Sequence, residues 1–169
     1  MVIFMKYYIN NFLIYSIIGF IVETITKLIF FPNMNNGFLY GPWIPVYGFG
    51  ACLIIFIMRF IFNRFKVNRI TKIILLFIIS SFILTILELI GGYLIEWITG
   101  DIFWDYSDLK FNIGHYIALE ISLLWGFMSI VITYVVKPIT DKVINKIPSY
   151  ITYLALAIII LDFTISCFS

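Results

Sequence analysis

The sequence predicts an all-α membrane protein, a single integral membrane domain of residues 1–169 built as a five-helix transmembrane bundle. Composition is the first observation: 63% of the residues are hydrophobic and only 12% are charged, whereas soluble domains carry about 25% charged and about 45–50% apolar residues. The second is a mean hydropathy of +1.08. The third is that five apolar segments have the length that a bilayer requires. The net charge of +2 gives no reason to expect nucleic acid as a partner.

A helix that crosses a bilayer needs about 20 mostly apolar residues. Five segments meet this length, at residues 9–30, 44–62, 70–98, 116–136 and 150–168. The third segment is long enough to tilt or to extend a turn beyond the membrane. The remaining connections are too short to hold a separate soluble domain.

The basic residues predict how these helices are oriented, because lysine and arginine accumulate in short cytoplasmic loops. Nine of the eleven lie before the first helix, or in and next to the connections between the second and third helices and between the fourth and fifth. They are Lys6, Arg59, Arg64, Lys66, Arg69, Lys72, Lys137, Lys142 and Lys146. Five crossings that start in the cytoplasm place all nine on one side. We therefore expect an N-in, C-out, multi-pass protein of the plasma membrane, with two irregular loops on its outer face.

The first outer loop, residues 35–50, carries no charge and combines glycines and prolines with aromatic residues. Those glycines and prolines are Gly37, Gly41, Pro42, Pro45, Gly48 and Gly50. Glycine permits a close backbone approach, and proline removes a helical hydrogen-bond donor. Because irregular backbone survives at membrane depth only where its polar groups are satisfied, we expect this loop to lie against protein. The residues leave open whether it enters the membrane or lies on it.

The second outer loop, residues 100–115, is acidic and aromatic and contains Trp104 and Asp105. One interpretation is an interfacial segment whose aromatic rings lie at headgroup level. The other is an outer vestibule that Trp104 lines together with Tyr40, Trp43 and Tyr47. The sequence alone favours neither.

Carboxylates within the predicted helices indicate a polar pocket in the outer half of the membrane. Ionisable groups in a bilayer are costly and usually face an interior or a cavity. The third helix shows the clearest pattern, because Thr85, Glu88, Gly92 and Glu96 recur at helical spacing on one face. The acidic residues that we assign to the pocket are Glu23, Glu88, Asp105, Glu96 and Glu120. Asp162 is a further carboxylate in the fifth helix.

Helix packing offers an alternative explanation for part of this pattern. Small and hydroxylated residues at helical spacing are also what helices use to pack in lipid, and Glu23 can pair with Lys27 four residues later. Cys52 and Cys167 show no metal or redox spacing. We therefore expect two free cysteines, no metal site and no cofactor.

Four motifs resemble the putative ABC-transporter type IV permease family of small polytopic membrane proteins. They are NGFLYGPWIPVYGFG at residues 36–50, WDYSDLKFNIGHYIALEISLLWGF at 104–127, YSIIGFIVETI at 15–25 and LELIGGYLIEW at 87–97. The resemblance covers most of the chain and implies a permease-like role. The chain has no GxxxxGK[ST] phosphate-binding loop, so any ATPase must be a separate partner at the cytoplasmic loops. Five helices make a small permease, which favours a homo-oligomer.

Three functions are compatible with these features. The first is a transporter or permease-like subunit whose outward-facing carboxylate pocket binds a cation, a proton or the polar end of a substrate. The second is an accessory or structural membrane subunit. The third is a membrane-embedded enzyme that modifies lipid, with acid–base groups from Asp105, Asp108, His115 and Glu120. The absence of a nucleophile elbow and of an HExxH motif argues against the enzyme.

Overall fold

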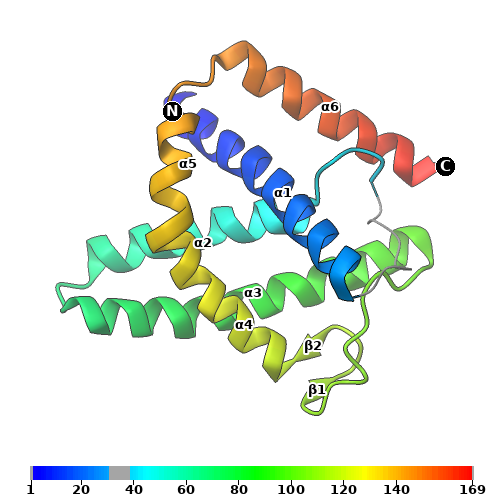
Figure 1. Ribbon diagram of the computed structural model, residues 1–169, viewed down its shortest axis with the longest axis horizontal. Coiled ribbons are helices and arrows are strands. Elements are labelled where there is room, and N and C mark those ends of the chain that lie inside the picture. Colours follow the sequence, from blue (N-terminus) through cyan, green and yellow to red (C-terminus); the bar gives the residue numbers. More distant parts are fainter. Residues whose placement is uncertain (1, 31–38, 169) are drawn as a thin grey trace. The chain divides into compact units, whose positions relative to one another are not determined.

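The computed structural model describes residues 2–30 and 39–168, and almost all of its regular structure is helical (Figure 1). Its elements are, in order, α1 (Val2–Phe30), α2 (Pro45–Arg64), α3 (Arg69–Thr99), β1 (Asn112–Ile113), β2 (Ile117–Ala118), α4 (Leu119–Val131), the π-helix η1 (Ile132–Val136), α5 (Lys137–Ile144) and α6 (Ser149–Phe168). The described residues contain five helices long and apolar enough to cross a membrane, as the sequence predicts. These are Phe4–Ile25, Pro45–Arg64, Arg69–Thr99, Leu119–Ile144 and Ser149–Phe168. The N-in, C-out orientation stays a prediction.

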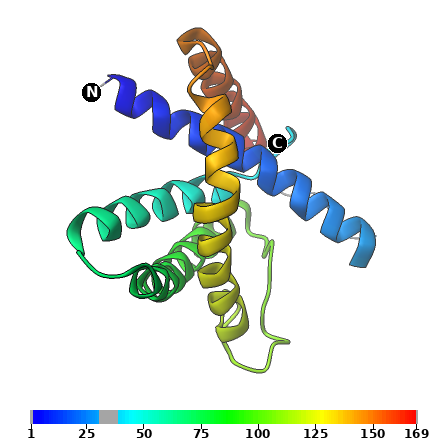
Figure 2. The same cartoon turned by 60° about the vertical axis from the view of Figure 1, so that its left-hand side comes forward.

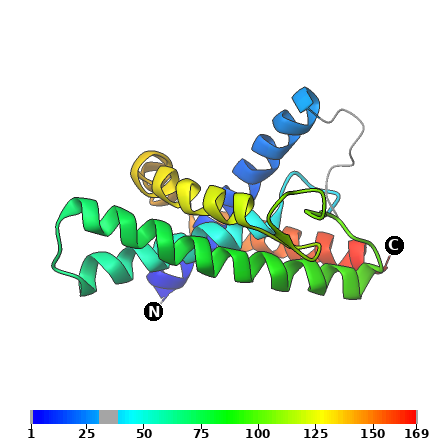
Figure 3. The same cartoon turned by 90° about the horizontal axis from the view of Figure 1, so that it is seen from below.

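Two compact units make up the chain. The first comprises Met1–Phe49 and Thr140–Ser169, and the second comprises Gly50–Ile139. In the first unit, α1 packs against α6. In the second, α2 and α3 form a helical hairpin that Figure 3 shows from below, and α3 packs extensively against α4.

The α2–α3 hairpin of the second unit buries a small apolar core around Ile57, Ile61 and Leu76. Asn68 caps the start of α3, because its Oδ1 accepts a hydrogen bond from the Thr71 backbone N–H at 2.8 Å. Gly100 ends the helix in the left-handed conformation, with φ at 77°, and its N–H bonds to the Glu96 carbonyl oxygen at 2.8 Å. Both ends of α3 are therefore defined by local sequence.

The fourth spanning helix differs from its predicted bounds at both ends. It begins at Leu119 rather than residue 116, because Ile117 and Ala118 pair antiparallel with Ile113 and Asn112. Gly114, with φ at 65°, makes the turn between these two short strands. At the other end the helix continues to Ile144 instead of ending at 136. Figure 2 shows α4, η1 and α5 as one continuous run of helix.

The π-helix η1 explains how helix continues past Pro138. A proline in a helix has no N–H to donate, and its ring clashes with the carbonyl four residues earlier. Just before Pro138, the Lys137 N–H bonds to the Ile132 carbonyl five residues back, which is the wider π pattern. The extra residue in this turn gives the backbone room for the proline ring. The sequence becomes more polar at Lys137, but the helix does not end there.

Candidate functional site

Glu88 joins three elements of the second unit. It lies on α3 and is only 7% exposed. Its Oε1 accepts a hydrogen bond from the Tyr106 hydroxyl at 2.6 Å, and its Oε2 accepts one from the Trp125 indole N–H at 2.8 Å. One turn away, the Thr85 hydroxyl donates to the Ser122 hydroxyl oxygen at 2.7 Å. We call Glu88, Tyr106 and Trp125 the Glu88 clamp, because they tie α3 to α4 and to the connecting loop.

Glu96 lies two turns further along α3 and accepts a hydrogen bond at Oε2 from the Tyr116 hydroxyl at 3.0 Å. Tyr116 is 1% exposed, and its ring covers Gly92 so closely that a β-carbon there would overlap it. Burial, with the Glu96 hydrogen bond next, raises the pKa of Tyr116 to about 12. The phenol therefore stays protonated at neutral pH and can donate to Glu96. The Trp104 ring packs edge-on against Tyr116, with ring centroids 5.8 Å apart.

The Trp104 indole N–H is buried yet has no hydrogen-bond partner among the residues that the structure describes. Its ring lies over Gly91, where an added β-carbon would be 3.9 Å from Cη2. Glu88, Glu96 and Trp104, which the sequence assigns to one pocket, thus all belong to the packed region between α3, α4 and the loop before β1. The hydrogen bonds that the two carboxylates accept here come from the neutral side chains of tyrosine and tryptophan.

Asp105 and His115 form an exposed pair in the same loop. His115 Nδ1 lies 3.1 Å from Asp105 Oδ2. Asp105 Oδ1 accepts hydrogen bonds from both the hydroxyl and the backbone N–H of Ser107, the latter at 2.8 Å. Glu120, by contrast, lies exposed in the first turn of α4, where a negative charge complements the helix dipole.

We expect Asp105 to titrate near pH 2. The Ser107 hydroxyl, the Ser107 N–H and His115 lower its pKa from the ordinary 3.8 to about 2. Because the pKa is lower in the folded loop, the stabilisation is complete above pH 4 and is lost as the pH falls through 2. A ¹³C NMR titration of the Asp105 carboxyl group measures this. In Ser107→Ala the midpoint should move back toward 3.8, and an unchanged midpoint would contradict the assignment.

In the first unit, Asp162 of α6 holds the irregular segment at residues 39–44. Its Oδ1 accepts a hydrogen bond from the Tyr40 N–H at 3.2 Å. Its Oδ2 accepts one from the Gly41 N–H at 3.0 Å and one from the Trp43 indole N–H at 2.7 Å. We call these four residues the Asp162 anchor. The Trp43 ring occupies the space that a side chain at Gly41 would need.

The segment is also joined to α1. The Ile44 N–H donates to the Ser16 carbonyl oxygen at 3.0 Å, and the Tyr47 hydroxyl donates to Glu23 Oε2 at 3.1 Å. The Tyr47 ring lies against Gly19, so a side chain at Gly19 would overlap it. Sequence reasoning noted Asp162 but gave it no partner. Its only signal was a single carboxylate in an otherwise apolar helix.

The glycines and prolines predicted as loop residues fall into three groups. Gly41 and the exposed Pro42 are irregular, as expected. Pro45, Gly48 and Gly50 instead lie in the first turns of α2. Proline is well suited to the first position of a helix. Gly48 packs so closely against α1 that a β-carbon there would overlap Ser16 and the Phe12 carbonyl oxygen. Gly37, like the side chain of Lys27, lies outside the described residues.

Sequence reasoning missed a polar network in the N-terminal half of α1. Asn10 is 1% exposed. Its Nδ2 donates to the Ile144 carbonyl oxygen at 3.5 Å, and its Oδ1 accepts from the Thr152 hydroxyl at 2.7 Å. Tyr7 donates to Asp141 Oδ1 at 2.9 Å. We call these contacts the Asn10 network. The available signal was two consecutive asparagines inside an apolar span.

The described residues contain no group of three or more His, Cys, Asp or Glu side chains that could hold a metal ion. Cys52 and Cys167 form no disulfide. The polar contacts described above include the Glu88 clamp and the Glu96 contact in the second unit, and the Asp162 anchor and the Asn10 network in the first. That the carboxylates of both units line one outward-facing pocket stays a prediction.

Comparison with known proteins agrees with the motif resemblance. The family model described as "Putative ABC-transporter type IV" matches residues 10–169. No curated protein and no solved structure matches the chain. The match covers all five spanning helices almost completely, together with the Glu88 clamp and the Asp162 anchor. The chain therefore belongs to the ABC-transporter type IV family that this model describes.

Proposed function

We propose that the protein is a transporter or permease-like membrane subunit and that the Glu88 clamp is its proton- or cation-binding site. The observation that carries the proposal is a buried carboxylate inside a spanning helix whose described hydrogen-bond partners, Tyr106 and Trp125, are both neutral. Ionisable groups within membrane helices usually mark ion pathways or substrate sites. The family description supports the transport role.

The surroundings of Glu88 support a binding site for a small positive species. A carboxylate has about four lone-pair positions, and the Tyr106 hydroxyl and the Trp125 indole take one on each oxygen. The remaining positions can accept a proton or a cation. The Trp104 ring lies over Gly91, which is on the same helix as Glu88. Its unpartnered indole N–H can donate to an anionic or carbonyl group of a substrate that binds together with the proton or cation. In this proposal Glu23, Glu120, Tyr40, Trp43 and Tyr47 line the outer part of the pathway.

An energy source has to come from outside the described fold. The sequence carries no phosphate-binding loop, so ATP-driven transport requires a separate ATPase subunit. We place that contact at the predicted cytoplasmic side, where nine of the eleven basic residues lie. Five helices enclose little space for a transport pathway, and a homo-oligomer would provide a wider one.

Proton flux through purified protein tests the Glu88 assignment. Liposomes that contain the protein and a trapped pH-sensitive dye are given a potassium diffusion potential, and the rate of internal acidification is recorded. We expect Glu88→Gln to slow the protein-dependent rate at least about tenfold, because the amide cannot exchange a proton. Replacing the proton gradient with a sodium gradient and a sodium dye tests the cation form of the proposal.

Asp101→Asn is the matched control, because Asp101 is an exposed carboxylate just beyond α3. It loses the same charge and should retain the wild-type rate. Both variants should melt near the wild-type temperature, since glutamine keeps the length and much of the hydrogen-bonding capacity of the glutamate side chain. Equal rates in wild type and Glu88→Gln, with both gradients, would show that Glu88 is not the site.

A structural role is the second candidate, and a specific observation favours it. Glu88, Glu96 and Asp162 each already accept hydrogen bonds from other elements of the chain. Such contacts stabilise helix packing in membranes by about 0.6 kcal/mol on average and by up to about 1.7 kcal/mol. In an accessory subunit, Glu88→Gln would lower the stability without changing flux. A partner that co-purifies in fixed stoichiometry would support this candidate.

A further inference from the structure

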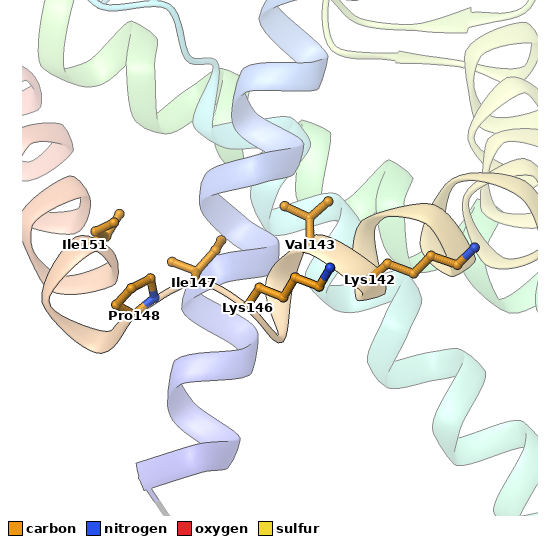
Figure 4. Close-up of a pocket in the computed structure, with 6 residues that line it drawn as sticks. All are labelled: Lys142, Val143, Lys146, Ile147, Pro148 and Ile151. Atoms are coloured by element: carbon orange, nitrogen blue, oxygen red, sulfur yellow. The ribbon is translucent and has the colours of Figure 1, made fainter.

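An open surface hollow with a volume of about 360 Å³ lies at the turn between α5 and α6. Its lining combines two lysines with apolar side chains: Lys142, Val143, Lys146, Ile147, Pro148 and Ile151. Figure 4 shows both lysine side chains extending from the same stretch of backbone, with Val143 between them. None of these residues belongs to the Glu88 clamp, the Asp162 anchor or the Asn10 network.

The charge in this hollow is uncompensated. Within the described residues, neither the Lys142 nor the Lys146 ammonium group has an ion-pair or hydrogen-bond partner, and both residues are exposed. The nearest acidic residue in sequence, Asp141, accepts a hydrogen bond from the Tyr7 hydroxyl at 2.9 Å. A hollow that is lined by two lysines and by apolar side chains complements a ligand with an anionic head and an apolar body.

The turn is held in place before any ligand arrives. The Asn10 side chain of α1 bonds to the Ile144 carbonyl on one side of the turn and to the Thr152 hydroxyl on the other. Ile144 is 2% exposed, and Thr152 is fully buried. The backbone that carries both lysines is therefore positioned by a buried polar network, which lowers the ordering cost of binding.

The position of the turn along the chain places it at a membrane surface. One candidate span ends at Ile144, and the next begins at Ser149. Tyr150, which is 71% exposed, and Tyr153, which is 41% exposed, follow within the first two turns of α6, and tyrosine is enriched at the membrane–water interface. We propose that this hollow binds one anionic phospholipid. The lysines hold its phosphate, and Val143, Ile147 and Ile151 contact its acyl chains.

Native mass spectrometry of the full-length protein in a non-ionic detergent tests the proposal with phosphatidylglycerol as the probe. The double variant Lys142→Gln, Lys146→Gln should bind phosphatidylglycerol about 30-fold more weakly, because each lysine near an anionic headgroup contributes about a fivefold change in affinity. Binding of phosphatidylcholine should not change. The difference between variant and wild type should shrink at 0.5 M salt (roughly a Debye length of 4 Å).

Arg64→Gln, Lys66→Gln is the matched control, because it removes the same charge from the exposed α2–α3 connection. It should retain nearly wild-type phosphatidylglycerol affinity. Equal weakening in both double variants would overturn the proposal, since the attraction would then come from net charge alone. Glycerol 3-phosphate that binds as tightly as the lipid would also overturn it, because the acyl contacts would then contribute nothing. Unchanged lipid binding with loss of a co-purifying protein would reassign the hollow to a protein partner.

Discussion

Replacing Gly92 with alanine should lower the free energy of unfolding by about 3 kcal/mol. Gly92 lies on α3 beneath the ring of Tyr116, and an added β-carbon would overlap the first atoms of that ring. Those atoms lie close to the Tyr116 backbone, which is fixed beside β2, so a small rotation of the side chain cannot relieve the overlap. Tyr116 would have to move, and its hydrogen bond to Glu96 would be lost.

The measurement is an unfolding titration of the purified protein from mild detergent into denaturing detergent. Gly91→Ala is the matched control, because it makes the same chemical change one residue earlier on the same helix. Its added β-carbon would meet only Trp104 Cη2, at 3.9 Å, which is an ordinary contact. We expect its stability to change by at most about 0.5 kcal/mol. Similar losses in both variants would mean that Tyr116 does not pack on Gly92 as described.

Asp162→Asn should cost about 2–4 kcal/mol, because the carboxylate accepts three hydrogen bonds and those to charged groups are the stronger kind. The amide has only one oxygen, so its NH₂ group would face an N–H donor of the Asp162 anchor. We expect Tyr40 and Gly41 to detach from α6, while α1 and α6 remain helical. Loss of the anchor should also expose the Trp43 indole.

Two readouts separate a local effect from global unfolding. The first is the same detergent titration. The second is the emission of Trp43 in a variant whose other three tryptophans are phenylalanine, which should shift to longer wavelength when the anchor opens. Thr164→Val is the control, since it removes an exposed polar group two residues further along α6 whose hydrogen bond stays within the helix. An emission maximum in Asp162→Asn that matches the control would refute the anchor.

Hydropathy alone located the five spanning helices because the bilayer demands a minimum apolar length. The finer boundaries depend on contacts that a single segment does not encode. Residues 116–118 are apolar enough for a helix, yet two of them pair with β1. Helix also continues through Pro138 because a π turn accommodates it, and composition at Lys137 shows only that polarity changes there.

The candidate site was also predictable only in part. Helical periodicity identified the face of α3 that carries Thr85, Glu88 and Glu96, and these side chains all contact residues of the α4 region or the loop before it. The partners were not predictable. Tyr106 is 18 residues from Glu88 and Trp125 is 37 residues away, so their meeting depends on how the helices pack. The Asn10 network was not predicted, because the site was sought among ionisable residues and asparagine side chains are neutral.

The Asp162 anchor has a consequence for how the protein is made. Its two backbone donors precede the carboxylate by 122 and 121 residues. At a synthesis rate of about 5–20 residues per second, roughly 6–25 s pass between the emergence of Gly41 and that of Asp162. During that interval the Tyr40 and Gly41 N–H groups must rely on water or on the insertion machinery. Chains released before residue 162 would keep this segment unanchored, which gives cellular quality control a way to recognise them.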